Sequence, residues 1–157
     1  MAHIMANSCV LFRPRLRSDH FHVRFYKGNG CSANVGRGMP NVVSLASGCE
    51  SFGVIVHELM HVLGFGHEHQ RSDRDEYVKV NTDHIKDKFK HNFNRNQKQI
   101  ERRLTEFDFD SIMMYKANEG SIDHNKPVIE SKIDGKVGNF GKGKVLSPLD
   151  IKSINLR

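Results

Sequence analysis

The chain has 157 residues, of which 38% are hydrophobic and 27% are charged, with a formal net charge of +6. This length suits one domain with a buried core, and no apolar run approaches the roughly 20 residues of a membrane-spanning helix, so the sequence predicts no membrane span. Lysines and arginines stand among acids, as in residues 71–76, and no known nucleic-acid-binding motif is present, so a solvated basic surface is favoured over a nucleic-acid binder, the weaker alternative.

The first part of the chain is expected to form mainly strands. Residues 1–5, Met-Ala-His-Ile-Met, look like a remnant of an expression vector, so His3 is excluded from the site and the domain is expected to begin at residue 6. Phe21, Val23 and Phe25 alternate with polar residues, which is the period of a half-buried strand. Short apolar runs predict three further strands, at residues 10–12, 31–35 and 42–45.

A helix is expected to follow. Ser51 is a suitable N-cap, and the apolar residues after it recur at the i, i+3, i+4 and i+7 spacing of a core-facing helix. These residues are Phe52, Ile55, Val56, Leu59 and Leu63. This apolar face does not account for the histidines of the same segment.

Five residues between positions 57 and 67 have the spacing of a catalytic metal site. His57 and His61, at i and i+4, project from one helix face and can reach one metal ion. Gly64 can adopt a positive φ, so the helix can end there and His67 can turn toward the same point. Three imidazoles leave one coordination position open for water, as in catalytic zinc sites, and Glu58 is placed to accept a proton from that water. The motif predicts a hydrolase with one Zn²⁺ per chain.

The second half of the chain is more polar. Residues 81–104 are expected to be helical in part, and loops are expected to predominate beyond Asp110. Ser147 as cap and Pro148 at the first helical position predict a final helix. Together these elements predict an α+β domain of two lobes, with the histidine-bearing helix on the floor of the cleft between them.

The three cysteines, Cys9, Cys31 and Cys49, have no C-x-x-C spacing, which argues against a second, cysteine-based zinc site. An odd number in a domain of this size indicates an oxidising compartment, one disulfide and one unpaired cysteine. Three reduced, buried thiols are the alternative.

The motif His57-Glu58-x-x-His61-x-x-Gly64-x-x-His67 resembles that of the metzincins. Residues 68–77, Glu-His-Gln-Arg-Ser-Asp-Arg-Asp-Glu-Tyr, and residues 111–115, Ser-Ile-Met-Met-Tyr, narrow the resemblance to the astacin family of secreted zinc endopeptidases. The resemblance implies a zincin-like α+β fold with a mixed sheet, a zinc-binding helix and a loop-rich C-terminal lobe. It also implies that His57, His61 and His67 bind zinc and that Glu58 is the general base.

Two further roles follow from the same resemblance. Met113 would form the Met-turn beneath the zinc ligands. Core packing is the alternative for both Met113 and Tyr115, and a methionine-rich stretch taken alone would favour it. Tyr115 would be an additional phenolic zinc ligand that can swing away and donate a hydrogen bond to the oxyanion of the reaction intermediate. The substrate would lie extended along an edge strand within residues 31–35.

Several features depart from the family pattern. Met114 stands where the family usually has a histidine that is not a zinc ligand. The family carries further residues before the equivalent of Cys9, including a buried N-terminus that reaches the position of Glu68. Glu68 is therefore expected to lose its partner and, if buried, to be an unsatisfied charge. The resemblance implies a bridge between Cys31 and Cys49, with the partner of Cys9 beyond residue 157, so residues 6–157 are expected to be an astacin-like peptidase domain truncated at both ends.

The leading hypothesis is a secreted, monomeric metalloendopeptidase. It would hydrolyse peptide bonds of protein or peptide substrates by zinc-bound water, with Glu58 as general base and Tyr115 as a second catalytic residue. The alternative is a zinc-binding but catalytically impaired fragment that acts only as a binding module. No nucleic-acid partner is expected.

Overall fold

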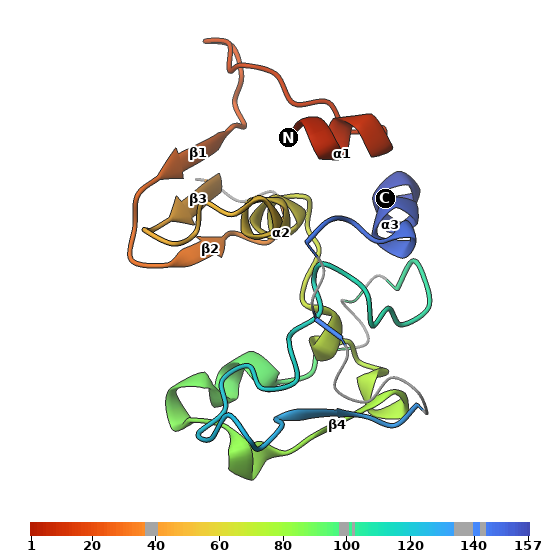
Figure 1. Ribbon diagram of the computed structural model, residues 1–157. Helices are drawn as coiled ribbons and strands as arrows, with labels where there is room; N and C mark the ends of the chain where they lie inside the picture. Colours follow the sequence, from red (N-terminus) through yellow and green to blue (C-terminus); the bar gives the residue numbers. More distant parts are fainter. Residues whose placement is uncertain (37–40, 98–100, 102, 134–139, 142–143) are drawn as a thin grey trace. The chain divides into compact units, whose positions relative to one another are not determined.

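The computed structural model describes residues 1–36, 41–97, 101, 103–133, 140–141 and 144–157. The chain divides into two compact units, one of residues 1–66 and 144–157 and the other of residues 67–143 (Figure 1). Each unit buries apolar side chains of its own. Within the described ranges, no helix is long and apolar enough to cross a bilayer.

A three-stranded mixed sheet belongs to the first unit. Its central strand, β3 (Asn41–Leu45), pairs in parallel with β1 (Val23–Tyr26) and antiparallel with β2 (Cys31–Ala33) (Figure 1). The strands expected near residues 21–25, 31–35 and 42–45 are therefore confirmed, with ends shifted by a few residues. The mixed sheet of the expected α+β fold is confirmed as well.

Two expectations for the N-terminal segment are wrong. Residues 10–12 form no strand, and Leu11 is 78% exposed. β1 is not half-buried, because Phe25 and Tyr26 are both exposed. The helix of residues 52–62 contacts mainly β2 and β3 of this sheet, whereas an alternating burial pattern in β1 would require a layer packed on one face of that strand.

Helix α2 (Phe52–Val62) carries the first two histidines of the motif. The Ser51 side chain caps its first turn, as predicted. Val56 and Leu59 are fully buried, whereas Phe52 is 53% exposed. The expected apolar face is therefore confirmed in the middle of the helix and absent from its first turn.

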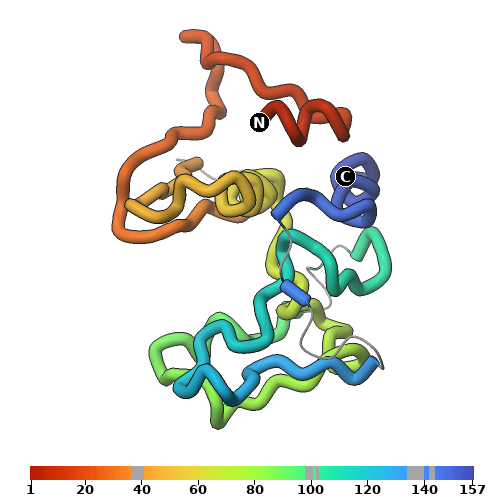
Figure 2. The backbone as a smooth tube through the Cα atoms, in the orientation of Figure 1, coloured from red at the N-terminus to blue at the C-terminus, as the bar shows by residue number. Residues whose placement is uncertain are grey.

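The two ends of the chain meet in the first unit, where α1 (Ala2–Asn7) and α3 (Pro148–Leu156) lie side by side (Figure 2). The Cys9 amide donates to Asn155 Oδ1 at 2.9 Å, which ties the end of α1 to α3. Ile4 is completely buried. Residues that look like a vector remnant in the sequence thus contribute a core side chain to this unit.

Helix α3 begins where the sequence predicts. Ser147 Oγ accepts the amide of Asp150, and the Asp150 carboxylate accepts the amide of Ser147. This reciprocal capping box, with Pro148 at the first helical position, satisfies amides that the helix itself leaves unpaired.

The second unit has little regular structure. Strands β4 (Val78–Val80) and β5 (Ile129–Ser131) form an antiparallel pair. The helical segments within its described residues are four short 3₁₀ helices: η1 (Glu68–Gln70), η2 (Arg74–Glu76), η3 (Thr82–His84) and η4 (Asp87–Phe93). Its buried core is a cluster of apolar residues: Val78, Ile85, Phe93, Phe107, Phe109, Met114, Val128, Ile129 and Phe140. The loop-rich C-terminal lobe and the partly helical segment within residues 81–104 are thus confirmed.

A disulfide joins Cys31 at the start of β2 to Cys49 in the loop before α2. Cys9 is exposed and has no disulfide partner among the described residues. The expected pairing is confirmed, and the alternative of three reduced, buried thiols is wrong.

Candidate metal centre

The three histidines of the motif converge. One ring nitrogen from each of His57, His61 and His67 lies within 4.8 Å of the others, so the set can hold one metal ion. The rings of His57 and His61, one helical turn apart on α2, have centroids 4.7 Å apart and are perpendicular. The spacing of the motif therefore predicted the convergence correctly.

A turn at Gly64 ends α2 and leads the chain to the third histidine. Gly64 has a φ of +92°, its amide donates to His61 O at 2.7 Å, and the Phe65 amide donates to Met60 O at 3.0 Å. This is the hydrogen-bond pattern of a Schellman motif, which places a residue with left-handed backbone directly after the helix. The positive φ predicted for Gly64 is confirmed.

The imidazole of His61 is held in its neutral form. It is 6% exposed, and burial, followed by the nearby His57, lowers the pKa of its imidazole to about 4. Its Nδ1 lies 2.8 Å from the Phe65 carbonyl oxygen. Because a carbonyl can only accept, Nδ1 carries the hydrogen and Nε2 carries the lone pair that a metal needs.

His67 contacts polar and aromatic side chains of the second unit. Its Nδ1 is 3.1 Å from Gln70 Oε1, and its ring centroid is 4.6 Å from that of Tyr115. Tyr115 also stacks on His69, with centroids 4.0 Å apart. His69 is completely buried, and its Nε2 lies 3.0 Å from the Asn92 carbonyl oxygen.

Glu58 lies next to His57 on α2 and is almost fully buried, with 4% of its surface exposed. Burial raises the pKa of its carboxyl to about 7. Its Oε2 has no hydrogen-bond partner among the described residues. A buried carboxyl oxygen without a hydrogen bond costs folding free energy, and a catalytic role is one explanation for such a group in a folded protein.

Residues 111–114 form the turn that contains Met113. The Met114 amide donates to Ser111 O at 3.1 Å, and the Met113 amide donates to Ser111 Oγ at 3.0 Å. The Met113 carbonyl accepts the amide of Glu68 at 3.0 Å. The predicted turn exists and is tied to the residue that directly follows His67, while the place of the Met113 side chain beneath the ligands stays a prediction.

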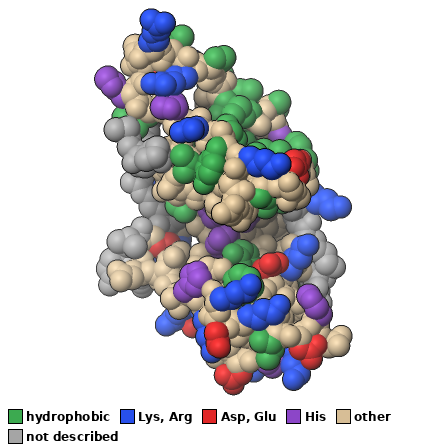
Figure 3. Space-filling model, turned by 90° about the vertical axis from the view of Figure 1, so that its left-hand side faces the viewer, with side chains coloured by type: hydrophobic (Ala, Val, Ile, Leu, Met, Phe, Trp, Pro, Cys, Tyr) green, Lys and Arg blue, Asp and Glu red, His purple; other side chains and the backbone are tan. Residues whose placement is uncertain are grey.

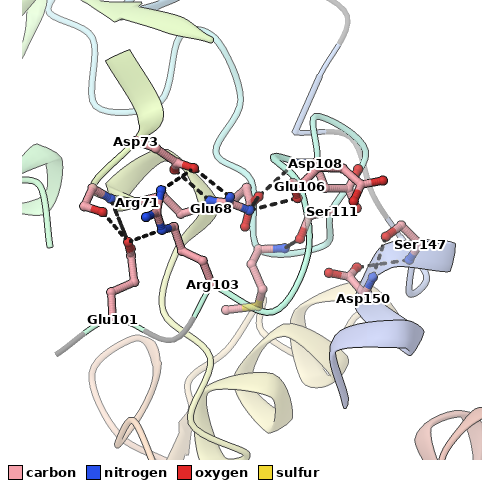
Figure 4. Close-up of polar contacts among 12 residues, drawn as sticks. Glu68, Arg71, Asp73, Glu101, Arg103, Glu106, Asp108, Ser111, Ser147 and Asp150 are labelled. Atoms are coloured by element: carbon pink, nitrogen blue, oxygen red, sulfur yellow. Dashed lines mark hydrogen bonds and ion pairs between the residues drawn. The ribbon is translucent and has the colours of Figure 1, made fainter. Parts of the chain in front are cut away.

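Glu68 does not lack a partner, so the expectation of an unsatisfied charge is wrong. Its Oε1 accepts from Arg71 Nη1 at 2.8 Å and from the Asp108 amide at 2.8 Å (Figure 4). Burial raises the pKa of the Glu68 carboxyl, and Arg71 and the amide act in the opposite direction. Arg71 also forms an ion pair with Asp73, which in turn pairs with Arg103.

The side chains present fit a zinc ion. In two imidazoles, those of His61 and His67, an acceptor faces Nδ1, so the hydrogen lies on Nδ1 and the lone pair on Nε2. Zinc binds neutral imidazole nitrogens through such a lone pair. The unpartnered oxygen of Glu58 supplies a carboxylate that is not needed elsewhere in the described structure. Three converging imidazoles with an adjacent carboxyl group are the donor set of a catalytic rather than a structural site.

An α+β fold with a three-histidine site that begins on a helix, together with a buried glutamate, is the architecture of a metallopeptidase domain. The sequence model of the astacin family of peptidases matches residues 1–157. The chain belongs to this family.

The relatives agree with this assignment. The chain is 38% identical over 160 residues to astacin-like metalloprotease toxin 2 from Loxosceles intermedia, covering 99% of this chain and 62% of the toxin. It is 40% identical over 121 residues to bone morphogenetic protein 1 from Xenopus laevis, covering 75% of this chain and 17% of that protein. The chain thus spans less than two thirds of the length of these relatives.

A solved structure shares the fold. High choriolytic enzyme 1, a hatching enzyme zinc-protease from Oryzias latipes, superimposes with a TM-score of 0.90 and 32% identity. The match covers 99% of this chain and 77% of the hatching enzyme. The metzincin-type fold inferred from the motif is therefore confirmed.

Sequence reasoning assigned no role to three of the groups around the histidines. Gln70 contacts His67, the Phe65 carbonyl contacts His61, and His69 stacks on Tyr115. Gln70 lies three residues after His67, and short helical turns bring residues at this separation together, so the spacing was the one sequence signal for this contact. The Phe65 contact uses the main chain, so no side-chain pattern could reveal it.

The charge distribution agrees with a solvated surface. On the face shown in Figure 3, Lys and Arg side chains are spread among acidic, hydrophobic and histidine side chains. Several basic side chains are used in local ion pairs, such as Arg95 with Asp75 and Lys90 with Asp87.

Proposed function

We propose that the chain is the catalytic part of a zinc endopeptidase that hydrolyses peptide bonds in protein or peptide substrates. The observation that carries the proposal is the convergence of three histidine nitrogens within 4.8 Å, next to the buried Glu58. The names of the similar proteins, a metalloprotease toxin and a hatching enzyme zinc-protease, support it.

Each of these side chains has a proposed role in the reaction. His57, His61 and His67 would hold the ion, which when bound supplies a Lewis acid that lowers the pKa of water and polarises a carbonyl oxygen. Glu58 would accept the proton of the attacking water and later return it to the leaving amine. Its burial supports this role, because a raised pKa makes the carboxylate a stronger base.

Tyr115 and Met113 are proposed to complete the site. The contact between the rings of Tyr115 and His67 supports a role for the phenol near the reacting groups, where its hydrogen can be donated to an oxyanion. Met113 is held in a turn whose carbonyl accepts from the residue after His67. We propose that this turn fixes the floor of the metal site.

We propose that the substrate binds in an extended conformation along β2. This strand lies at an edge of its three-stranded sheet, and Cys31 and Ser32 are exposed. Backbone groups at a sheet edge can pair with an added strand, which gives affinity without requiring a particular side-chain sequence.

We also propose that the enzyme is secreted and acts as a monomer. The disulfide between Cys31 and Cys49 supports an oxidising compartment. All proposed metal ligands and the proposed base come from one chain, so the chemistry does not require a second copy.

The test is zinc quantitation combined with cleavage-site profiling on a peptide library. We expect one zinc per chain, loss of cleavage when a chelator removes the metal, and recovery when zinc is returned. Cleavage that survives metal removal would contradict the proposal, as would a zinc-loaded chain that cleaves no peptide.

A further inference from the structure

The side-chain amide of Gln70, the last residue of η1, makes a hydrogen bond through each of its two polar atoms. Its Oε1 lies 3.1 Å from His67 Nδ1, and its Nε2 donates to the Asn92 carbonyl oxygen at 2.9 Å. Its backbone is tied as well, because the Gln70 amide donates to His67 O at 3.1 Å and Gln70 O accepts from the Asn96 amide at 2.7 Å. The Gln70 amide group is therefore fixed in one place.

The chemistry of these partners also fixes its orientation. A carbonyl oxygen can only accept hydrogen bonds, so Asn92 O requires the NH₂ end of the Gln70 amide. The other end, Oε1, then faces His67 and can only accept. His67 must accordingly carry its hydrogen on Nδ1, which leaves the lone pair on Nε2.

His61 reaches the same tautomer by a different route. There the acceptor for Nδ1–H is a main-chain carbonyl, that of Phe65, which any residue type at that position would supply. At His67 the acceptor is a side chain, so its effect depends on the identity of residue 70. A single substitution can thus remove it.

We propose that Gln70 is a positioning residue for the third metal ligand: anchored on Asn92, it selects the Nδ1–H tautomer of His67 and directs Nε2 to the ion. The inference rests on the proposed function, in which His67 is a zinc ligand. Outer acceptors of this kind orient ligand imidazoles and raise their basicity, and their loss typically weakens metal affinity about 10–100-fold.

Gln70 could serve only as a mechanical tether between η1 and η4, since Asn92 belongs to η4. A tether and a positioning residue differ in one respect. The tether needs the bond from Gln70 Nε2 to Asn92, whereas the tautomer needs an acceptor facing His67 Nδ1. Two variants of residue 70 separate these requirements.

Gln70→Leu removes both contacts, and Gln70→Glu keeps an acceptor for His67 while losing the donor to Asn92. Zinc affinity is measured by competition with a chelator. The dissociation constant should be about 10–100-fold higher than that of wild type for Gln70→Leu and close to that of wild type for Gln70→Glu. Gln97→Leu, which changes an exposed glutamine of the same unit, is the matched control and should leave zinc affinity unchanged. Equal zinc affinity in Gln70→Leu and wild type would overturn the proposal, and so would an equal loss in both residue-70 variants.

A second measurement needs no variant and no metal. Nitrogen-15 NMR of the metal-free wild-type protein at about pH 8, where an ordinary imidazole is neutral, reports which ring nitrogen of His67 carries the hydrogen. We expect Nδ1–H, and an Nε2–H assignment would overturn the proposal. If wild type binds no zinc, the proposed function fails, while this tautomer assignment still decides the role of Gln70.

Discussion

At the scale of single residues, Glu58 combines two properties that rarely occur together in a side chain without a function. It is buried, and one of its carboxylate oxygens has no hydrogen-bond partner among the described residues. Burial raises its pKa to about 7 from an ordinary value of 4.5. The folded, metal-free chain therefore holds a proton that the unfolded chain has already released between these two pH values.

The sign of the resulting pH dependence follows from linkage. Because the folded state binds more protons in this window, the free energy of unfolding of the metal-free protein decreases as pH rises from about 4.5 to about 7. Glu58→Gln cannot titrate, so we expect the variant to be more stable than wild type at about pH 8 and of similar stability at about pH 4. Thermal unfolding of both metal-free proteins across pH checks this, and a difference that does not change with pH would contradict it.

The sequence could identify those site residues whose positions depend on contacts between near neighbours in the chain. The spacing of His57, His61 and His67 predicted their convergence, because one helix and one glycine turn determine it. Glu68 was misjudged because its actual partners, Arg71 and the Asp108 amide, were not anticipated. The arginine was available at i+3, but the amide lies 40 positions away and could not be predicted from the sequence.

At the scale of elements, the turn that ends α2 sets the path of the chain toward His67. Gly64 has a φ of +92°, and a Cβ there would also collide with the guanidinium of Arg157. We expect Gly64→Ala to destabilise the protein by about 1–2 kcal/mol, the cost of left-handed backbone for a residue with a Cβ, and to weaken zinc binding because His67 follows the turn. Gly30→Ala is the matched control, since a Cβ at Gly30 meets nothing within 4 Å. Equal effects of the two substitutions, measured by denaturant unfolding and zinc titration, would contradict this account.

Hydrogen bonds from Arg71 to the Glu106 carbonyl and from the Asp108 amide to Glu68 join η1 and the residue after it to the loop that contains Glu106 and Asp108. Arg71 is 9% exposed, and its guanidinium donates to Glu68, Asp73 and the Glu106 carbonyl. Arg71→Met would remove the counter-charge of the largely buried Glu68, while Asp73 would keep its ion pair with Arg103. We therefore expect a loss of about 3–5 kcal/mol in the free energy of unfolding.

The control for this variant is the ion pair of Arg13 and Asp19, in which the arginine side chain is exposed to water. Arg13→Met should change stability little. Chemical denaturation of both variants makes the comparison, and a similar small effect for Arg71→Met would show that the network contributes less than its burial implies.

The elements that were predicted well are those with strong local chemistry. Ser51 and Ser147 begin helices because their side chains accept amides of the first turn. Residues 10–12 were expected to form a strand on composition alone, but a strand requires a partner, and none of the described strands pairs with them. The short 3₁₀ helices of the second unit have no periodic pattern, so their bounds could not be predicted.

The first unit of the molecule depends on one covalent link. The disulfide closes a segment with a sequence separation of 18 residues, and loss of such a bridge typically costs about 2–4 kcal/mol. We expect this loss for the Cys31→Ser, Cys49→Ser double variant in thermal or denaturant unfolding. Cys9→Ser should have little effect, because Cys9 is exposed and forms no disulfide within the described structure. An unchanged midpoint for the double variant would contradict the prediction.

The whole chain matches the astacin family, yet it spans only 62% of the length of the toxin from Loxosceles intermedia. Membership establishes the fold and the type of site. Whether the chemistry proceeds depends on the residues themselves, above all on the carboxylate that must move a proton.

Replacement of that carboxylate is the most direct test. In Glu58→Gln, the shape of the side chain and the three histidines are kept, so we expect one zinc per chain as in wild type. The rate of peptide cleavage should fall by at least about 100-fold, since general base catalysis contributes about 10²–10⁴-fold. Glu76→Gln, at an exposed glutamate of η2, should cleave at the wild-type rate. Turnover by zinc-loaded Glu58→Gln comparable to wild type would contradict the account.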